Sequence, residues 1–250
     1  MAERSGCYII AEAGCEHAGS IERAKELIDV ATYAGADCVK FQLFYPEEVG
    51  AKVWNKIKKF HIGYTDMIKL SAYAETKDID FLCSAFGLRS LHALSGLCKS
   101  IKVPAPCNEW DEYLQLAHEL FKKVIVSSGM THKGLWPGDT VLQCTSAYPC
   151  PYDQVNLNTL HKYDGLSDHT LGIHIPVAAV ALGARIIEKH FTLVEPGDPI
   201  SQGGPDAGMA LSPSQLDAMV EQIRQIEQAM GDGEKRIEES ERELLCRKTL

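Results

Sequence analysis

Eight short β-rich segments, separated by helical or irregular segments, constrain the fold of this 250-residue chain more than any other feature. This alternation is typical of parallel strands joined by crossover helices. At this length it favours one (β/α)8 barrel, in which active sites collect at the C-terminal ends of the strands. A doubly wound open sheet is the alternative, but the glycine cluster at 13–19 lacks the GxGxxG pattern of a dinucleotide site. The expected strands are 8–13, 38–43, 81–85, 100–104, 123–127, 141–145, 165–168 and 185–190.

Capping residues mark the first and the last of the connecting helices. Ser20 can cap a helix whose apolar positions recur at helical spacing. The last helix has Ser212 as its N-cap, Pro213 at its first position and Gly231 just past its end. The connection after the fifth strand, 130–139, contains two glycines and a proline, which predicts an irregular crossover there instead of a helix.

Composition excludes several classes of partner. The formal charge is −9 with only 25 lysines and arginines, and no basic stripe suits nucleic acid or anionic lipid. No apolar run resembles a secretory signal or a membrane span, so we expect a soluble, cytoplasmic protein with one domain over residues 1–250. The nine cysteines lack CxxC spacing, which argues against a disulfide framework or a zinc knuckle.

Two histidines stand at the ends of the seventh and eighth expected strands. His169 and His190 are separated by an apolar helix expected over 176–182, so a β-helix-β unit brings both imidazoles to one edge of the sheet. Borderline metals accept imidazole, and two protein ligands leave coordination positions open for substrate and water. The pair predicts a catalytic metal site. The alternative is that each histidine is a buried residue satisfied by hydrogen bonds.

Two lysines are expected among hydroxyl groups at the same strand ends. Lys40 and Gln42 alternate onto the inner side of their strand, and Lys102 ends the fourth strand. Ammonium groups neutralise a phosphate or carboxylate while hydroxyls orient it, so a phosphorylated anion is the implied ligand. The alternative for both lysines is a salt bridge within the barrel. The hydroxyl side chains are Ser84, Ser127, Ser128, Thr145, Ser146, Tyr148 and Ser167.

Several of these segments resemble motifs of the sialic acid synthase family, in order along nearly the whole chain. Among them are AGADCVKFQ at 34–42, CTSAYP at 144–149, GLSDHTLG at 165–172 and IEKHFT at 187–192. The family includes N-acetylneuraminate synthases and enzymes that make legionaminic, pseudaminic and spore-coat sugar acids. The resemblance implies a (β/α)8 transferase of carbohydrate and polysaccharide biosynthesis. Such an enzyme condenses phosphoenolpyruvate with an aldose, typically N-acetylmannosamine, to give an α-keto sugar acid and phosphate.

The same resemblance assigns roles to the strand-end residues. It implies that His169 and His190 bind a divalent metal, with Mn²⁺ as first choice and Mg²⁺, Co²⁺ or Zn²⁺ as alternatives. The partners are then small molecules, and the family also suggests a homodimer. The implied phosphoenolpyruvate-binding residues are Lys40, Ser84, Lys102, Ser127, Ser146 and Ser167. The residues implied at the sugar and its chemistry are Glu12, Gln42, Tyr148 and Asp206.

The chain departs from the family pattern on the acceptor side. Residues 102–107 read Lys-Val-Pro-Ala-Pro-Cys where the family has Lys-Ile-Ala-Ser-Gly-Glu, which removes a phosphate-binding serine and an acidic group near the sugar. Ala207 replaces a histidine after Asp206, behind an enlarged loop at 195–203, and the chain ends at Leu250 before the family's antifreeze-like domain with its arginine. We therefore expect a synthase with an altered acceptor. The alternatives are a metal-dependent α-keto acid aldolase and a degenerate barrel that binds a sugar acid or a protein without turnover.

Overall fold

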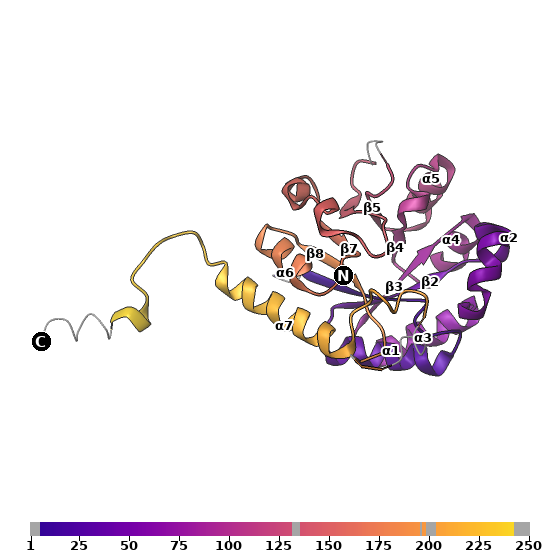
Figure 1. Ribbon diagram of the computed structural model, residues 1–250. Coiled ribbons are helices and arrows are strands. Elements are labelled where there is room, and N and C mark those ends of the chain that lie inside the picture. The colour runs from indigo at the N-terminus through magenta and orange to yellow at the C-terminus, as the bar shows by residue number, and fades with distance from the viewer. Residues whose placement is uncertain (1–5, 132–135, 196, 199–203, 243–250) are drawn as a thin grey trace, which may run out of the picture.

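Eight parallel strands form a closed barrel in chain order, with the last strand paired to the first (Figure 1). The computed structural model describes residues 6–131, 136–195, 197–198 and 204–242. The expected (β/α)8 barrel is confirmed, and the open sheet is wrong because β1 pairs with β8. The strands are β1 (Tyr8–Gly14), β2 (Cys38–Leu43), β3 (Asp80–Ala85), β4 (Ser100–Val103), β5 (Lys123–Ser127), β6 (Thr140–Cys144), β7 (Gly165–Asp168) and β8 (Ile186–His190).

Helices surround the barrel (Figure 1). Within the described ranges, none is both long and apolar enough to cross a lipid bilayer. The α-helices are α1 (Ile21–Tyr33), α2 (Pro46–Ile57), α3 (Tyr64–Thr76), α4 (Leu88–Ser95), α5 (Asp111–Leu120), α6 (His174–Ala181) and α7 (Pro213–Ala229). The short 3₁₀ helices are η1 (Lys58–Phe60), η2 (Ala105–Cys107), η3 (Tyr152–Gln154) and η4 (Leu157–Lys162).

The predicted helix caps are present. The Ser20 side chain accepts a hydrogen bond from the Arg23 amide, and Ser212 accepts one from the Gln215 amide in a complete capping box. Helix α7 ends two residues before Gly231, whose φ of 59° is the left-handed conformation that follows many helices.

Helix α6 starts earlier than predicted. It begins at His174, two residues before the expected start at Pro176, and ends at Ala181. A proline in the first turn of a helix removes no intrahelical hydrogen bond, because the first four N–H groups have no partner within the helix.

Two connections lack an α-helix in the part of the chain that the structure describes. After β5, the described residues 130–131 and 136–139 form bends and turns, as predicted for this crossover, while 132–135 lie outside the described residues. After β6 only η3 and η4 occur, which the sequence analysis did not predict. Pro149 and Pro151 at its start and the left-handed Asn156 within it account for the absence of an α-helix.

The barrel interior changes from apolar to polar along the strands. Side chains two residues apart on a strand point to the same face, so the inward positions form layers. The apolar cluster at the strand starts is followed two residues later by buried polar groups near the C-terminal ends. These successive inward pairs include Ile10 and Glu12, Cys38 and Lys40, Leu82 and Ser84, Ile125 and Ser127, and Ile186 and Glu188.

Candidate active site

A cavity of about 100 Å³ lies at the C-terminal mouth of the barrel. All the predicted site residues line it except Ser146 and Asp206. A larger cavity of about 390 Å³ lies at the opposite end, beside the starts of β3 and β4, and contains none of them. The C-terminal mouth is the catalytic face of (β/α)8 enzymes, so we assign the site there. Its lining is Glu12, Lys40, Gln42, Ser84, Phe86, Lys102, Pro104, Ala105, Pro106, Ser127, Cys144, Tyr148, Ser167, His169, Glu188 and His190.

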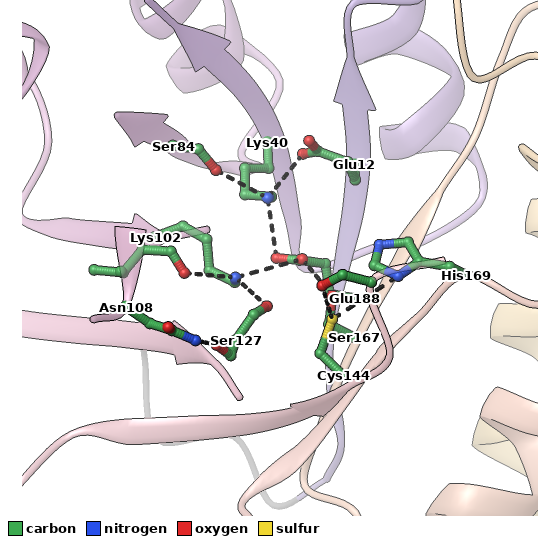
Figure 2. Close-up of polar contacts among 12 residues, drawn as sticks. Glu12, Lys40, Ser84, Lys102, Asn108, Ser127, Cys144, Ser167, His169 and Glu188 are labelled. Atoms are coloured by element: carbon green, nitrogen blue, oxygen red, sulfur yellow. Dashed lines mark hydrogen bonds and ion pairs between the residues drawn. The ribbon is translucent and has the colours of Figure 1, made fainter. Parts of the chain in front are cut away.

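Glu188 lies at the centre of the polar layer, between the two lysines (Figure 2). Its carboxylate is 3.2 Å from the Lys40 ammonium and 3.8 Å from the Lys102 ammonium. It also accepts a hydrogen bond of 2.8 Å from the Ser167 hydroxyl. Both lysines are therefore ion-paired, as the alternative interpretation held, and both also line the cavity.

The surroundings of the two lysines differ. Lys40 has a second carboxylate, Glu12, at 3.2 Å and donates to the Ser84 hydroxyl at 3.1 Å. Lys102 donates to the Ser127 hydroxyl at 2.6 Å. Burial acts to lower the pKa of each ammonium, yet the combined attraction of Glu12 and Glu188 raises the pKa of Lys40. For Lys102 burial dominates, and its pKa falls.

The two carboxylates beside Lys40 differ in their affinity for protons. Burial acts to raise the pKa of Glu188, but Lys102 and Lys40 outweigh it and lower that pKa to about 2. Burial raises the pKa of Glu12 despite the attraction of Lys40. Glu12 is 1% exposed and accepts a hydrogen bond of 2.7 Å from the Gln42 amide. Glu188 is thus a fixed anion, whereas Glu12 is the carboxyl that can take up a proton.

The imidazoles of His169 and His190 face each other, with ring centroids 5.6 Å apart. The Nδ1 of His169 lies 3.0 Å from the Thr145 carbonyl oxygen and donates to it, which leaves Nε2 available as a ligand. The Nδ1 of His190 is buried and has no hydrogen-bond partner among the residues that the structure describes. Burial, His169 and Lys40 hold the pKa of His190 well below its usual value, so the ring is neutral, as metal binding requires.

This pair fits a divalent metal by the chemistry of its donors, because imidazole nitrogens are ligands for such ions and the two rings lie 5.6 Å apart, centroid to centroid. Within the described ranges, no cluster of three or more His, Cys, Asp or Glu side chains has metal-binding geometry. Two imidazoles would leave coordination positions for substrate and water.

Cys144 ends β6 beside this pair. Its Sγ lies 3.9 Å from the Nδ1 of His169 and 3.8 Å from the Ser146 hydroxyl. Burial acts to raise the pKa of the thiol, but the hydrogen bond and charge of His169 outweigh it and lower the pKa. The opposite holds for Cys83 and Cys107, where burial raises the pKa of each thiol.

The remaining predicted residues occupy the rim. The Tyr148 ring lies 4.2 Å from the His169 ring, centroid to centroid, and is 57% exposed. The Asp206 carboxylate lies 3.7 Å from the Nδ1 of His190. Ser146 does not line the cavity and is instead packed against Gly129. Ser146 was predicted to belong to the anion-binding residues, but in the structure its side chain lies outside the cavity that they line.

Sequence reasoning missed three residues of the site. Glu188 could have been found, because Ile186, Glu188 and His190 alternate onto one face of β8. Cys144 gave no local signal for a place beside His169, since their contact spans 25 positions. Asn108 follows η2 and donates 2.8 Å hydrogen bonds to the carbonyls of Ser127 and Gly129, which fixes the end of β5.

Known proteins share this barrel and much of its sequence. The family model described as NeuB family matches residues 27–135 and 138–235. The N,N'-diacetyllegionaminic acid synthase of Campylobacter jejuni is 37% identical over 93% of this chain and 80% of that protein. The human N-acetylneuraminate-9-phosphate synthase is 31% identical over 92% of this chain and 73% of its own length.

A solved structure agrees with the sequence relatives. The N-acetylneuraminic acid (sialic acid) synthetase of Leptospira borgpetersenii, in complex with citrate, superimposes with a TM-score of 0.84 at 28% identity. The match covers 98% of this chain and 92% of that one. The closed barrel and the charged C-terminal cavity define a (β/α)8 enzyme, and its named relatives are synthases of sugar acids. The chain belongs to the NeuB family.

Proposed function

We propose that this enzyme condenses phosphoenolpyruvate with an N-acetylated amino or deoxy aldose to give a nonulosonic acid and phosphate. Carbon three of phosphoenolpyruvate forms a bond to the aldehyde carbon, water adds at carbon two, and phosphate leaves with cleavage of its carbon–oxygen bond. The observation that carries the proposal is the pair of buried lysines beside two facing histidines in one cavity. The synthase names of the relatives support the same class of reaction.

The lysines and serines of the cavity suit a phosphorylated carboxylate. Lys40 and Lys102 lie in the interior with serine hydroxyls at 3.1 and 2.6 Å, so each ammonium has a neutral partner that orients it. In the free enzyme Glu188 balances both cations. An anion that enters the cavity replaces water around these groups and gains charge-assisted hydrogen bonds. The cradle we propose consists of Lys40, Ser84, Lys102, Ser127 and Ser167.

The histidines and Glu12 suit the aldehyde end of the acceptor. We propose that His169 and His190 hold a divalent ion, Mn²⁺ in first place, which would polarise the aldehyde oxygen when bound. Glu12 is paired with His190 across β1 and β8 and has a raised pKa, so it can give a proton to the forming hydroxyl. Gln42 orients Glu12 through its 2.7 Å hydrogen bond.

The wall beside β3 and β4 is apolar, which supports an acceptor other than the typical N-acetylmannosamine. Phe86, Pro104, Ala105 and Pro106 line the cavity, and the family carries a serine at the position of Ala105 and a glutamate at that of the neighbouring Cys107. Such a wall leaves polar hydroxyl groups without partners and favours a methyl or deoxy group. We propose an N-acetylated amino aldose that also carries a deoxy position on this ground.

The test is phosphate release from phosphoenolpyruvate with Mn²⁺, across a panel of N-acetylated and deoxy aldoses. We expect aldose-dependent release that chelation abolishes, and a loss of at least about a hundredfold in His169→Ala. His161→Ala, on the exposed η4, is the matched control and should retain full activity.

The alternatives give different results in the same assay. A metal-dependent aldolase would form or cleave an α-keto acid without releasing phosphate. A non-catalytic barrel would be stabilised by a sugar acid and would show no turnover that His169→Ala could change. Either result would contradict the synthase proposal.

A further inference from the structure

A buried carboxylate in the loop after β1 holds the turn that carries Asp206. Glu16 is fully buried. One of its oxygens accepts a hydrogen bond of 2.8 Å from the Gly204 amide, and the other accepts one of 3.0 Å from the Asp206 amide. These contacts join positions 188 and 190 residues apart in the chain. Each oxygen of the Glu16 carboxylate thus accepts one backbone hydrogen bond, and both donors belong to the same turn.

The turn fits closely against this loop. A Cβ added at Gly204 would lie 2.5 Å from the Cys15 carbonyl oxygen and 2.7 Å from the Glu16 Cα, so only glycine allows the approach. On its other side the segment is tied to the end of β8, where the Leu211 amide donates to the His190 carbonyl at 2.9 Å. The Asp206 backbone is therefore fixed from both directions.

The fixed turn directs the Asp206 carboxylate toward a site histidine. Asp206 Oδ2 lies 3.7 Å from the Nδ1 of His190, a buried nitrogen that forms no hydrogen bond within the described part of the chain. A carboxylate at this position fixes the orientation of the imidazole and strengthens the other ring nitrogen as a donor of electrons. A shift of about 1 Å in such a supporting group is enough to cost about a hundredfold in rate.

We propose that Glu16 is a positioning residue that holds Asp206 against His190 and so sets the geometry of the histidine pair. The inference rests on the proposed synthase function for its kinetic test. Glu16 does not line the cavity, and it acts through Asp206.

A carboxylate is required here because two amide donors converge on it. Burial raises the pKa of Glu16, and the Gly204 amide, the Thr192 hydroxyl and the Asp206 amide partly offset that rise. Glutamine has nearly the same shape but a single acceptor oxygen, and its NH₂ group would face an amide N–H. Glu16→Gln therefore keeps the packing and removes one of the two backbone contacts.

The experiment compares Glu16→Gln, Asp206→Asn and the double variant by kcat and KM for phosphoenolpyruvate and acceptor. Each single change should lower kcat by about tenfold to a hundredfold, because Glu16→Gln loses a hydrogen bond that holds the turn and Asp206→Asn loses the carboxylate charge beside His190. The KM for phosphoenolpyruvate should change by less than about threefold, since the lysine cradle is intact. The double variant should be no slower than Asp206→Asn, because both changes act on one unit.

Glu195→Gln is the matched control. Its side chain also accepts a backbone hydrogen bond, from the Ser214 amide at 3.0 Å, but holds the start of α7 instead of the site. It should retain wild-type kcat. Glu16→Asp provides a second test variant that keeps the charge and shortens the side chain, should Glu16→Gln fail to fold.

Three results would overturn the inference or separate it from the proposed function. Wild-type kcat in Glu16→Gln, or effects that multiply in the double variant, would show that Glu16 does not act through Asp206. Absence of phosphate release from the wild-type enzyme across the panel would refute the proposed function instead. Crystal structures of the wild type and of Glu16→Gln then decide the inference: Asp206 displaced from His190 in the variant supports it, and an unchanged position overturns it.

Discussion

Lys40 and Lys102 line the same cavity but differ in the number and distance of the carboxylates around their ammonium groups. Lys40 lies between two carboxylates at 3.2 Å each, and Lys102 has one at 3.8 Å. The opposite directions of their pKa shifts follow from this difference. Residues that look equivalent in the sequence therefore contribute differently to stability and to ligand binding.

Replacing each lysine by methionine should reveal this difference. Lys40→Met leaves the buried Glu12 without its cation and Glu188 with only Lys102 at 3.8 Å, so it should lower the free energy of unfolding by about 3 to 5 kcal/mol. Lys102→Met should cost less, because Glu188 keeps Lys40 and Ser167 as partners. Both should raise the KM for phosphoenolpyruvate by more than about tenfold. Urea unfolding and phosphate release measure the two effects, with the exposed Lys69→Met as control; equal losses of stability would contradict the assignment.

Cys144 should be the most reactive of the described cysteines. The thiol lies beside His169 and has a lowered pKa, whereas burial raises the pKa of Cys83 and Cys107. Thiolates are the reactive form, so iodoacetamide at neutral pH should modify Cys144 at least about tenfold faster than the other two. Peptide mass spectrometry measures the rates. Protection of Cys144 by Mn²⁺ would also support the metal site, and equal labelling of all three thiols would refute the contact with His169.

At the scale of elements, the chain order and the ends of the strands follow from local sequence. Strands β2, β5 and β7 have the predicted bounds, because β-rich runs and their turn residues are local signals. The lack of an α-helix between β6 and β7 was not predicted, although Pro149 and Pro151 restrict the start of that connection. Contacts between strand ends, such as Cys144 with His169, could not be predicted from spacing because the closed barrel creates them.

The pairing of β7 with β8 brings the two histidines together. At Gly165 the two strands lie too close for a side chain. A Cβ at Gly165 would overlap with the Ile186 backbone at the start of both strands. Gly165→Ala should therefore lower the free energy of unfolding by about 4 kcal/mol or more, and activity should fall with it. Gly208→Ala is the control, because a Cβ there would meet no atom of the described residues within 4 Å. Thermal and urea unfolding compare the two; similar stability of both variants would contradict the close approach of the strands.

At the scale of the whole molecule, the loop after β1 links parts of the chain that are distant in sequence. Glu16 binds the turn at 204–206, and a Cβ at Gly19 would lie 2.5 Å from the Lys59 carbonyl oxygen in η1. Between them, His17 is 1% exposed and its ring lies 6.2 Å from that of Phe41. Protonation of His17 should therefore affect the contacts of this loop with the turn at 204–206 and with η1, as well as the local turn.

His17 must be neutral in the folded protein. Its Nδ1 accepts a hydrogen bond of 3.1 Å from the Gly19 amide, which a protonated nitrogen could not accept. Burial first, and then His61 and Arg23, lowers the pKa of His17 to about 4. In the unfolded chain the pKa is about 6.5. Above that value both states are neutral and His17 costs nothing, whereas between about pH 6.5 and 4 only the unfolded state takes up the proton, so stability falls as the pH falls.

The expected loss can be measured against a variant that cannot titrate. Between pH 7.5 and 4.5 the free energy of unfolding of the wild type should fall by about 2 to 3 kcal/mol more than that of His17→Asn. Asparagine can still accept from the Gly19 amide but loses the ring packing, so His17→Asn should start from a lower stability at pH 7.5 and change less with pH. The exposed His161→Asn should follow the wild type at every pH. Urea unfolding at several pH values gives the curves, and parallel curves for wild type and His17→Asn would show that another group governs acid stability.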